Sequence, residues 1–395
     1  MLIGLVGRPN VGKSTFFKAA TLSEVLIANY PFATIKPNRG VGYVKIDCID
    51  KEFGVKCQPR TGYCVNGKRF VPIELMDVAG LVKGASEGKG LGNQFLDDLR
   101  QADAFIHIVD ISGKTNAEGK ATENYDPTQD IEMLEEELDL WYVGILKKVW
   151  KTFTRLLKNT KENFAKAVAK QFSGLKVSED DVKDVLKKLG YNPENSIKWT
   201  DEQLKNFAHE LRHLTKPMII AANKCDMPIA KSNLEKLKKA YPDLLIIPCS
   251  ADSELALREA EKNRLIEYIP GEGNFKIKKN NLSDKQKNAL ELIEKNVLDV
   301  YGNTGVQKIL NSIVFDLLKY IAIFPAGANK LADSEGHILP DCFLMPEGST
   351  ALDFAYYLHT DFGKNFIKAI DARSKRALSK DYKLKNRDAL EIITR

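Results

Sequence analysis

The segment that most constrains the fold of this chain is Gly7-Arg8-Pro9-Asn10-Val11-Gly12-Lys13-Ser14, which matches Gly-x-x-x-x-Gly-Lys-Ser. It lies between an apolar run, 2–6, that is predicted to be a buried strand and a segment, 12–20, that is predicted to be a helix. In this context the loop amides and the helix N-terminus can surround phosphate groups, with Lys13 reaching the β- and γ-phosphates and Ser14 binding Mg²⁺. The expected phosphate-binding residues of the loop are Gly7, Asn10, Val11, Gly12, Lys13, Ser14 and Thr15.

The motif Asp77-Val78-Ala79-Gly80 follows a second predicted strand, 71–76. A carboxylate at that strand end can hold the coordination shell of Mg²⁺, and the Gly80 amide can contact the γ-phosphate. An isolated Asp-x-x-Gly motif is also typical of an ordinary turn at a strand end. Its position after a phosphate-binding loop favours the metal site.

A hydroxyl group that binds Mg²⁺ and senses the γ-phosphate is expected between these two motifs. The segment 29–38, with the sequence Asn-Tyr-Pro-Phe-Ala-Thr-Ile-Lys-Pro-Asn, lies there and contains Thr34. Thr21 is the weaker candidate for the same role. The residues predicted to bind Mg²⁺ are therefore Ser14, Thr34 and Asp77.

The segment Asn223-Lys224-Cys225-Asp226 ends a further predicted strand, 217–223, and specifies the base. Asp226 can accept hydrogen bonds from N1–H and the 2-amino group of guanine together, whereas adenine offers neither donor in that geometry. A site rejects the wrong base when that base leaves a buried carboxylate unpaired. Another predicted strand, 244–248, precedes a segment where a backbone amide can contact guanine O6. The predicted guanine site consists of Asn223, Lys224, Asp226, Ser250 and Ala251.

In this order the motifs are those of a guanine-nucleotide-binding P-loop domain, and the chain resembles the Obg-related GTPases, specifically the YchF subfamily and its archaeal relatives. The resemblance covers nearly the whole chain and rests on the phosphate loop, on the segment 29–38 and on the segments 77–85 and 88–93. It implies an α/β fold, in which a P-loop NTPase domain of Ras-like type with a mostly parallel sheet carries an inserted α-helical domain and a C-terminal β-grasp (TGS) domain. Several YchF proteins lack Asn-Lys-x-Asp and prefer ATP. This chain keeps Asn223, Lys224 and Asp226, so GTP is expected.

The pattern of apolar residues supports this division. Predicted strands alternate with helices up to 110, which is typical of a parallel sheet covered on both faces. Apolar residues then recur every three or four positions from 131 to 156, which predicts one helix of about 30 residues whose apolar face packs on neighbouring helices. Two shorter helices are expected after it, one framed by Ser178 and Gly190 and one with a capping box at Thr200. The predicted domains are a G domain in two parts, 1–126 and 215–314, a helical insertion, 127–214, and a TGS domain, 315–395.

The C-terminal domain is expected to be small and mixed, with strands at 337–345, 366–372 and 389–394 and a helix at 349–359. From Lys364 to Arg395 the chain carries ten basic and four acidic side chains, and this excess accounts for the net charge of +6. Such a segment suggests a polyanionic partner, with RNA the first candidate, while a solvated charged surface is an equally supported alternative. The family resemblance implies association with ribosomes or RNA, and no DNA sequence specificity is expected.

The residue after Gly80 is Leu81, where Ras-like GTPases have a glutamine that orients the attacking water. Leucine cannot do so, and the loss of one catalytic donor raises the barrier by roughly 3–4 kcal/mol, so slow intrinsic hydrolysis is expected. The resemblance implies that K⁺ supplies the missing group, with Asn10 as its ligand. The alternative is that Asn10 only ties the loop together. A switch that orders around GTP is expected at Leu81, Gly84, Gly88 and Gly90.

Composition and cysteine usage exclude several other classes. Hydrophobic residues make up 44% of the 395 residues, which is enough for packed cores, and no run of 18 apolar residues predicts a membrane span. Six cysteines without a Cys-x-x-Cys pair favour a reducing cytoplasm over a disulfide framework. Cys48, Cys57 and Cys64 lie close in sequence, but a zinc site would need a fourth ligand. Ordinary thiols in a surface excursion are the preferred interpretation.

Two histidine-containing segments invite a metal or catalytic interpretation. His209-Glu210-Leu211-Arg212-His213 matches His-Glu-x-x-His, the helical motif of zinc peptidases. No obvious third ligand follows at a helical spacing, so we interpret the match as accidental. His107 lies in an apolar strand and is expected to be a core residue rather than a base.

The sequence therefore predicts a cytoplasmic, Mg²⁺-dependent GTPase that acts as a switch. Two other functions are kept as alternatives. One is a module that docks on ribosomes or RNA and holds nucleotide mainly as a structural ligand with negligible turnover. The other is an ATP-preferring relative, which the carboxylate of Asp226 disfavours because adenine cannot donate to it.

Overall fold

The structure, a computed structural model, describes residues 1–22, 38–78, 100–160, 162–278, 282–333 and 335–395. The described residues form two compact units, one drawn from 1–19, 38–40 and 74–309 and the other from 20–22, 41–73 and 310–395. The second unit thus joins an early excursion of the chain to its C-terminal part. The domain boundaries expected from the sequence do not anticipate this grouping and stay a prediction.

A seven-stranded sheet carries the motifs singled out above. Its strands are β1 (Leu2–Val6), β2 (Arg39–Asp47), β3 (Tyr63–Val65), β4 (Lys68–Asp77), β5 (Ala104–Asp110), β6 (Met218–Asn223) and β7 (Leu245–Pro248). The strand order is β2-β4-β1-β5-β6-β7, with β3 paired to β4. The neighbouring strands from β4 through β1, β5 and β6 to β7 are parallel, and β3 is antiparallel to β4. The carboxyl ends of the parallel strands therefore meet at one edge of the sheet.

Burial on both faces explains why these short segments are strands. Every side chain of β1, β5 and β6 is buried, as in a parallel sheet covered by helices. His107 of β5 is 1% exposed, as expected for a core residue. Burial disfavours its charged form and lowers the pKa of His107 to about 3.

Helices α1 (Lys13–Thr21), α7 (Ala230–Ala240) and α8 (Ala251–Lys262) follow strands β1, β6 and β7 directly in the chain. A short hairpin of β8 (Ile266–Tyr268) and β9 (Phe275–Ile277) comes next, which the sequence pattern did not predict. The remaining helical segments of this region are α9 (Asp284–Ile293), η5 (Glu294–Leu298), α10 (Asp299–Tyr301), α11 (Val306–Asn311) and η6 (Ser312–Leu317).

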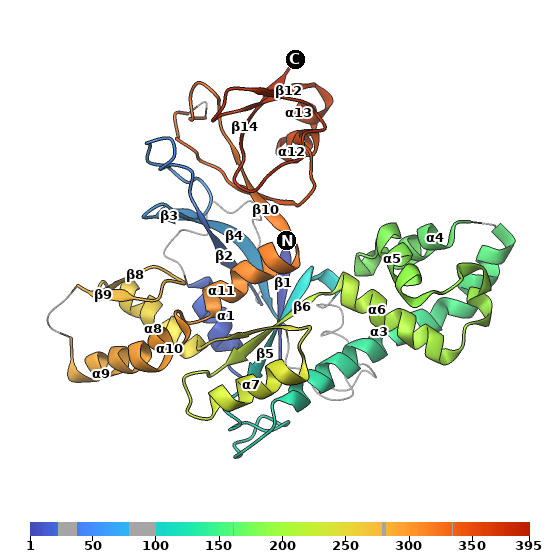
Figure 1. Ribbon diagram of the computed structural model, residues 1–395, viewed down its shortest axis with the longest axis horizontal. Coiled ribbons are helices and arrows are strands. Elements are labelled where there is room, and N and C mark those ends of the chain that lie inside the picture. The colour runs from blue at the N-terminus through green and yellow to red at the C-terminus, as the bar shows by residue number, and fades with distance from the viewer. Residues whose placement is uncertain (23–37, 79–99, 161, 279–281, 334) are drawn as a thin grey trace. The chain divides into compact units, whose positions relative to one another are not determined.

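The predicted long helix is α3 (Thr128–Thr160), and α6 (Asp201–Thr215) lies beside it (Figure 1). Both expected cap signals are present. Ser178 begins α5 (Glu179–Leu189) with a capping box and Gly190 ends it in the left-handed conformation, while Thr200 forms the capping box of α6. One further helix, α4 (Phe164–Gln171), was missed; it spans only about two turns, and two of its four buried residues are alanines. The short 3₁₀ segments are η3 (Ser173–Leu175) and η4 (Pro193–Lys198).

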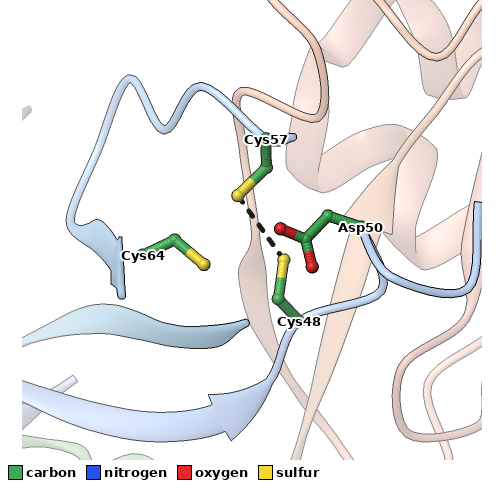
Figure 2. Close-up of side chains that lie close together, drawn as sticks. All are labelled: Cys48, Asp50, Cys57 and Cys64. Atoms are coloured by element: carbon green, nitrogen blue, oxygen red, sulfur yellow. Dashed lines mark hydrogen bonds between the residues drawn. The ribbon is translucent and has the colours of Figure 1, made fainter. Parts of the chain in front are cut away.

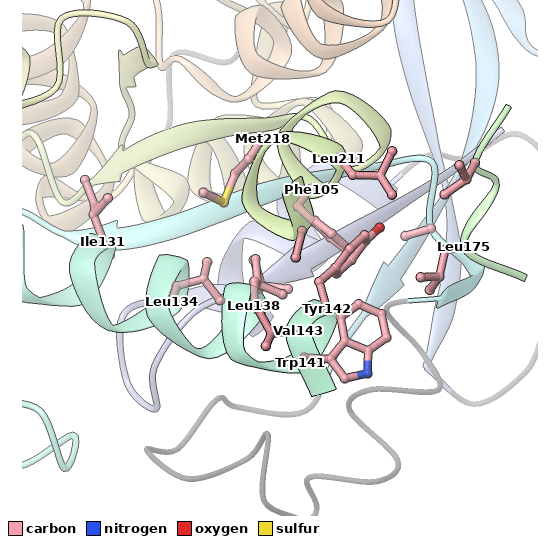
Figure 3. Close-up of a cluster of buried hydrophobic side chains, with 14 of the residues drawn as sticks. Phe105, Ile131, Leu134, Leu138, Trp141, Tyr142, Val143, Leu175, Leu211 and Met218 are labelled. Atoms are coloured by element: carbon pink, nitrogen blue, oxygen red, sulfur yellow. The ribbon is translucent and has the colours of Figure 1, made fainter. Parts of the chain in front are cut away.

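The apolar face of α3 does not pack on helices alone. Figure 3 shows Ile131, Leu134 and Leu138 of α3 in one cluster with Phe105 of β5 and Met218 of β6. This first half of the stripe therefore anchors the helix to the sheet as well as to its neighbours. Leu156, counted in the predicted stripe, is 61% exposed, and the adjacent Leu157 is buried in its place. Alternating spacings of three and four average 3.5 residues, whereas an α-helix has 3.6 residues per turn. Over a helix of this length the difference moves the buried face from one position to the next.

The C-terminal region has a five-stranded mixed sheet with the order β11-β10-β14-β12-β13. Its elements are β10 (Tyr320–Pro325), β11 (Phe343–Pro346), α12 (Ala351–Leu358), α13 (Thr360–Lys364), β12 (Phe366–Asp371), β13 (Ala377–Leu378) and β14 (Ala389–Thr394). Strands β12 and β14 and helix α12 match expectation. The predicted strand 337–345 is wrong over 337–342, where the backbone pairs with 58–60 instead, and β10 was missed. Among the described residues, no helix is long and apolar enough to cross a membrane.

Candidate nucleotide-binding site

The phosphate loop and the strand-end aspartate come together at the carboxyl ends of β1 and β4. Leu5 and Asp77 are partners in the parallel register of these strands, which sets the loop after β1 beside that carboxylate. The Lys13 ammonium lies 2.6 Å from Asp77 Oδ1, and the Ser14 hydroxyl lies 3.4 Å from Asp77 Oδ2. A hydroxyl and a carboxylate at this separation are oxygen ligands of the kind Mg²⁺ prefers, so the residues present fit that ion.

Asn223 ties the phosphate loop to the second half of the site. Its Nδ2 donates to the carbonyl of Val11 at 2.8 Å, and its Oδ1 accepts from the amide of Ala251 at 3.0 Å. The side chain is 3% exposed, so both bonds are shielded from water. The Ala251 amide, one of those in the segment expected to contact guanine O6, thus donates to Asn223 in this structure.

Lys224 connects the loop to β5. Its ammonium lies 2.7 Å from Asp110 Oδ2 and donates to the carbonyl of Asn10 at 3.2 Å. Burial would raise the pKa of Asp110, but hydrogen bonds from Lys224, Ser112 and Thr115 outweigh that effect and lower it. Asp110 is the register partner of Asn223, so both ends of this network are fixed by the sheet.

Two backbone positions shape the loop itself. Gly12 has φ +95°, and a Cβ there would lie 2.3 Å from Asn223 Nδ2, so only glycine fits. Asn10 also has a positive φ, 65°, and its Nδ2 donates to the carbonyl of Gly119 at 2.8 Å. This bond agrees with the alternative in which Asn10 ties the loop together, while its role toward K⁺ stays a prediction.

The remaining guanine-site residues lie on the segments just after β6 and β7. Asp226 is half-buried in the turn that follows β6, and Ser250 caps α8. The Ser250 amide donates to the carbonyl of Thr304 at 2.9 Å, and the Cys225 amide donates to the carbonyl of Cys249 at 3.1 Å. The second of these backbone bonds brings the Asn-Lys-x-Asp segment next to the segment that contains Ser250 and Ala251.

Part of the predicted site lies outside the residues that the structure describes. This holds for the third Mg²⁺ ligand, for the γ-phosphate amide and for the switch, so those roles stay predictions. The residues concerned are Thr34, Gly80, Leu81, Gly84, Gly88 and Gly90. The competing hydroxyl, Thr21, is described and ends α1, and Thr15 lies nearly two turns closer to the loop in the same helix.

Arg8 is a residue of this region that sequence reasoning missed. It is 6% exposed, forms an ion pair of 2.9 Å with Asp130 of α3 and donates to the Tyr125 hydroxyl at 2.8 Å. Burial raises the pKa of Asp130 to about 6, against the opposing effects of Arg8 and Tyr125. The phosphate loop is thereby tied to the start of the helical region. An arginine inside the loop motif was the only available signal, since its partner lies far away in sequence.

Comparison with known proteins decides the family. Three family models match: 50S ribosome-binding GTPase over residues 2–148, Obg-like GTPase YGR210-like, G4 motif-containing domain over 221–327, and TGS domain over 325–394. A GTP-binding protein of Methanocaldococcus jannaschii is 49% identical over 100% of this chain and 99% of that protein. The ribosome-binding ATPase YchF of Buchnera aphidicola is 32% identical over 93% of this chain and 86% of that protein. This chain belongs to the YchF subfamily of Obg-related GTPases.

Solved structures confirm the fold of this YchF-family chain. A GTP binding protein from Pyrococcus horikoshii is 40% identical, with a TM-score of 0.81 and full coverage of both chains. The Schizosaccharomyces pombe YchF GTPase, at 23% identity and a TM-score of 0.60 over 100% of this chain and 97% of that one, agrees in fold. The expected P-loop GTPase fold with a mostly parallel sheet, a helical region and a TGS domain is therefore confirmed.

The His-Glu-x-x-His segment of this YchF-family chain belongs to an ion-pair network, in which the ring centroids of His209 and His213 lie 4.3 Å apart. His209 Nδ1 lies 2.6 Å from Asp139, whereas His213 Nε2 lies 3.2 Å from Glu135. Glu210, which would be the base of a peptidase, pairs with Lys188 at 2.5 Å. The histidines are thus each paired with a carboxylate of α3, which supports the interpretation of the motif as accidental.

The cysteines between β2 and β3 depart from expectation. Cys48 and Cys57 are 4% and 7% exposed, so the interpretation as surface thiols is wrong for them. Their sulfur atoms lie 3.6 Å apart, and Cys64 and Asp50 complete a cluster in which one ligand atom of each lies within 4.8 Å of all the others. Asp50 is the fourth group that sequence spacing did not indicate.

Proposed function

We propose that this YchF-family protein binds GTP with Mg²⁺ and hydrolyses it slowly to GDP and phosphate as a molecular switch. The observation that carries the proposal is the pair of hydrogen bonds of Asn223, which join the phosphate loop at Val11 to the segment at Ala251. A loop joined in this way to the Asn-Lys-x-Asp turn sets the phosphate and base positions at a fixed separation. Asp226 is then available to accept from guanine.

Mg²⁺ would be held by the Ser14 hydroxyl and by the carboxylate of Asp77, with Thr34 as the third protein ligand predicted from the sequence. When bound, the ion neutralises charge on the β- and γ-phosphate oxygens. Lys13 would supply a further positive charge there. Lys13 forms an ion pair of 2.6 Å with Asp77, and a bound phosphate would compete with this carboxylate for the ammonium.

Base preference is the sharpest test, because several relatives are named ATPases, among them the Buchnera YchF protein. Calorimetric titration with GTP and ATP in Mg²⁺ buffer should show preference for GTP. Asp226→Asn removes two charge-assisted hydrogen bonds. It should lower the affinity for GTP about 100-fold or more and raise the affinity for xanthosine triphosphate. Asp243→Asn, an exposed carboxylate before β7, is the matched control. Preference for ATP, or GTP affinity unchanged in Asp226→Asn, would reject the assignment of the base.

Hydrolysis is tested separately by single-turnover phosphate release. A slow rate above background is expected, because Leu81 cannot orient the attacking water. The rate is measured in KCl and in NaCl, since equal rates would remove K⁺ from the proposal. Tight GTP binding with no phosphate release above background would favour the alternative, a docking module with nucleotide as a structural ligand.

We further propose that the protein associates with ribosomes or RNA through its TGS domain and the basic segment 364–395. The support is the name of relatives such as the ribosome-binding ATPase YchF of Bacillus subtilis, together with the excess of basic side chains. Arg373 and Arg387 already pair with Glu52, so they are weaker candidates for the contact. Cosedimentation with ribosomal subunits, with a GTP analogue or GDP at two salt concentrations, tests this. A salt-insensitive association would count against the basic segment.

A further inference from the structure

The excursion between β2 and β3 has almost no hydrophobic core of its own. Of residues 48–62, the buried ones are Cys48, Ile49, Asp50 and Cys57. Three of these four side chains belong to the cysteine–aspartate cluster. A segment of this length that buries so little apolar surface needs another source of order, such as a disulfide or a metal ion.

The separations within the cluster fit the spacing of ligands around one metal ion. Figure 2 shows the side chains of Cys48, Asp50 and Cys57 from the excursion and Cys64 from β3 directed toward one another. Two sulfur ligands at 2.3 Å from a tetrahedral zinc ion lie about 3.8 Å apart, and the Cys48 and Cys57 sulfurs are separated by 3.6 Å. A disulfide bond would need a separation of about 2.05 Å. A Cys48–Cys57 disulfide would also not explain why Cys64 and Asp50 lie beside these two sulfurs.

We propose that Cys48, Cys57, Cys64 and Asp50 bind one structural zinc ion. Three soft thiolates with one carboxylate in a closed, buried set select Zn²⁺ over Mg²⁺ or Ca²⁺, which prefer all-oxygen shells. Four protein ligands leave no open position, so the site would be structural and not catalytic. On binding, the thiols release their protons to the solvent as the metal–sulfur bonds form.

A buried cation lies near the cluster. The Cys48 thiol donates to the Cys57 sulfur, and Arg69 lies close enough to Cys57 to act on it electrostatically. Arg69 is fully buried and donates to the carbonyls at 339 and 340. Its guanidinium opposes the net negative charge that three thiolates and a carboxylate keep after binding one divalent ion.

The backbone around the cluster brings its ligands together. The Cys48 amide donates to the carbonyl of Gly67 at 2.8 Å, which holds the first ligand beside the β3–β4 turn. Gly62 has φ +71°, and a Cβ there would lie 2.0 Å from the carbonyl oxygen of Phe70. Only glycine can therefore occupy position 62, in the segment that connects Cys57 to Cys64.

The zinc ion would order residues 58–60, to which the segment 338–341 is hydrogen-bonded. The amides of Gln58 and Arg60 donate to the carbonyls at 338 and 340, at 2.8 and 2.9 Å, and Arg60 forms an ion pair with Asp341. These residues lie in the run between Cys57 and Cys64. Removing the ion should free that run, so hydrogen exchange at the amides of residues 58 and 60 should accelerate.

The test begins with the full-length protein, purified under reducing conditions and dialysed against Mg²⁺ and GDP so that the nucleotide site holds no zinc. Elemental analysis should find about one zinc per chain. Cys57→Ser and Cys64→Ser should lose it and show faster exchange at residues 58 and 60. Cys342→Ala, a buried thiol of the same unit outside the cluster, and His213→Ala, in the His-Glu-x-x-His segment, should keep it.

A second measurement covers the case in which the serine variants do not fold. Metal-free wild-type chain titrated with Co²⁺ should give the intense visible absorption of a tetrahedral, thiolate-bound ion, and Zn²⁺ should displace it. Protein that contains no zinc and gives no such spectrum would overturn the proposal. So would zinc retained in both cysteine variants, iron in place of zinc, or a Cys48–Cys57 disulfide found by peptide mapping of the reduced preparation.

Discussion

Asn223 donates to the carbonyl of Val11 at 2.8 Å across 212 positions of sequence, from the end of a strand to the phosphate loop. The same side chain accepts from Ala251. An amide side chain offers a donor and an acceptor at once, whereas a carboxylate lacks the donor and an apolar group lacks both. Asn223 therefore acts as a brace between three loops, in addition to any contact with a nucleotide.

Asn223→Ala should consequently weaken both folding and binding. The carbonyl of Val11 and the amide of Ala251 would lose their buried partner, which costs about 1–3 kcal/mol of unfolding free energy. GTP affinity should fall because the loops are no longer held at a fixed separation. Urea unfolding and calorimetry measure the two effects. Asn263→Ala, whose bond to Glu259 is exposed at the end of α8, is the control and should change neither quantity strongly.

Gly12→Ala tests the close approach of the loop to Asn223. The added Cβ would lie 2.3 Å from Nδ2 at a φ of +95°, so the loop must shift and the brace must break. We expect destabilisation of about 1 kcal/mol or more and at least about a 10-fold loss of GTP affinity.

Gly144→Ala is the matched control, because a Cβ at that position of α3 meets no atom within 4 Å. It should stabilise the protein by about 0.5–1 kcal/mol through the higher helix propensity of alanine. Equal effects of the two substitutions on GTP binding would contradict the role given to Gly12.

Local sequence patterns allowed much of this fold to be predicted. Contacts between residues that the fold brings together could not be predicted from such patterns. The strand 2–6 has the bounds expected from its apolar run, and the capping box at Thr200 is present, because each depends on a few neighbouring residues. The phosphate loop was predicted for the same reason. Asp50 was missed because only the path of the chain brings it to Cys57, and Arg8 because its partner Asp130 is 122 positions away.

The network around Arg212 makes stability depend on pH through Glu135. Burial would raise the pKa of Glu135, but His213 and Arg212 outweigh it and hold the pKa at about 2, below the ordinary 4.5. A carboxylate with a lowered pKa in the folded state stabilises fully above the unfolded value, and this contribution is lost as pH falls from about 4.5 toward 2. By linkage it amounts to about 3 kcal/mol.

Glu135→Gln should therefore flatten the decline of unfolding free energy below pH 4.5, measured by urea unfolding at several pH values. Glu136→Gln removes an exposed carboxylate from the next position of α3 and should keep the wild-type slope. A Glu135→Gln profile parallel to that of the wild type would show that this carboxyl does not change its protonation on unfolding in that range.

The pairing of Arg8 with Asp130 should couple the phosphate loop to the helical region energetically. Arg8→Gln leaves a buried carboxyl group without its cation, and breaking such a pair costs about 3–5 kcal/mol. In an Asp130→Asn background the same substitution should cost less, with a coupling energy of about 0.5–3 kcal/mol in a double-mutant cycle. Lys183→Gln, which removes a solvent-exposed pair with Glu179, should leave stability near that of the wild type. Additive effects of Arg8→Gln and Asp130→Asn would mean that the pair does not link the two elements.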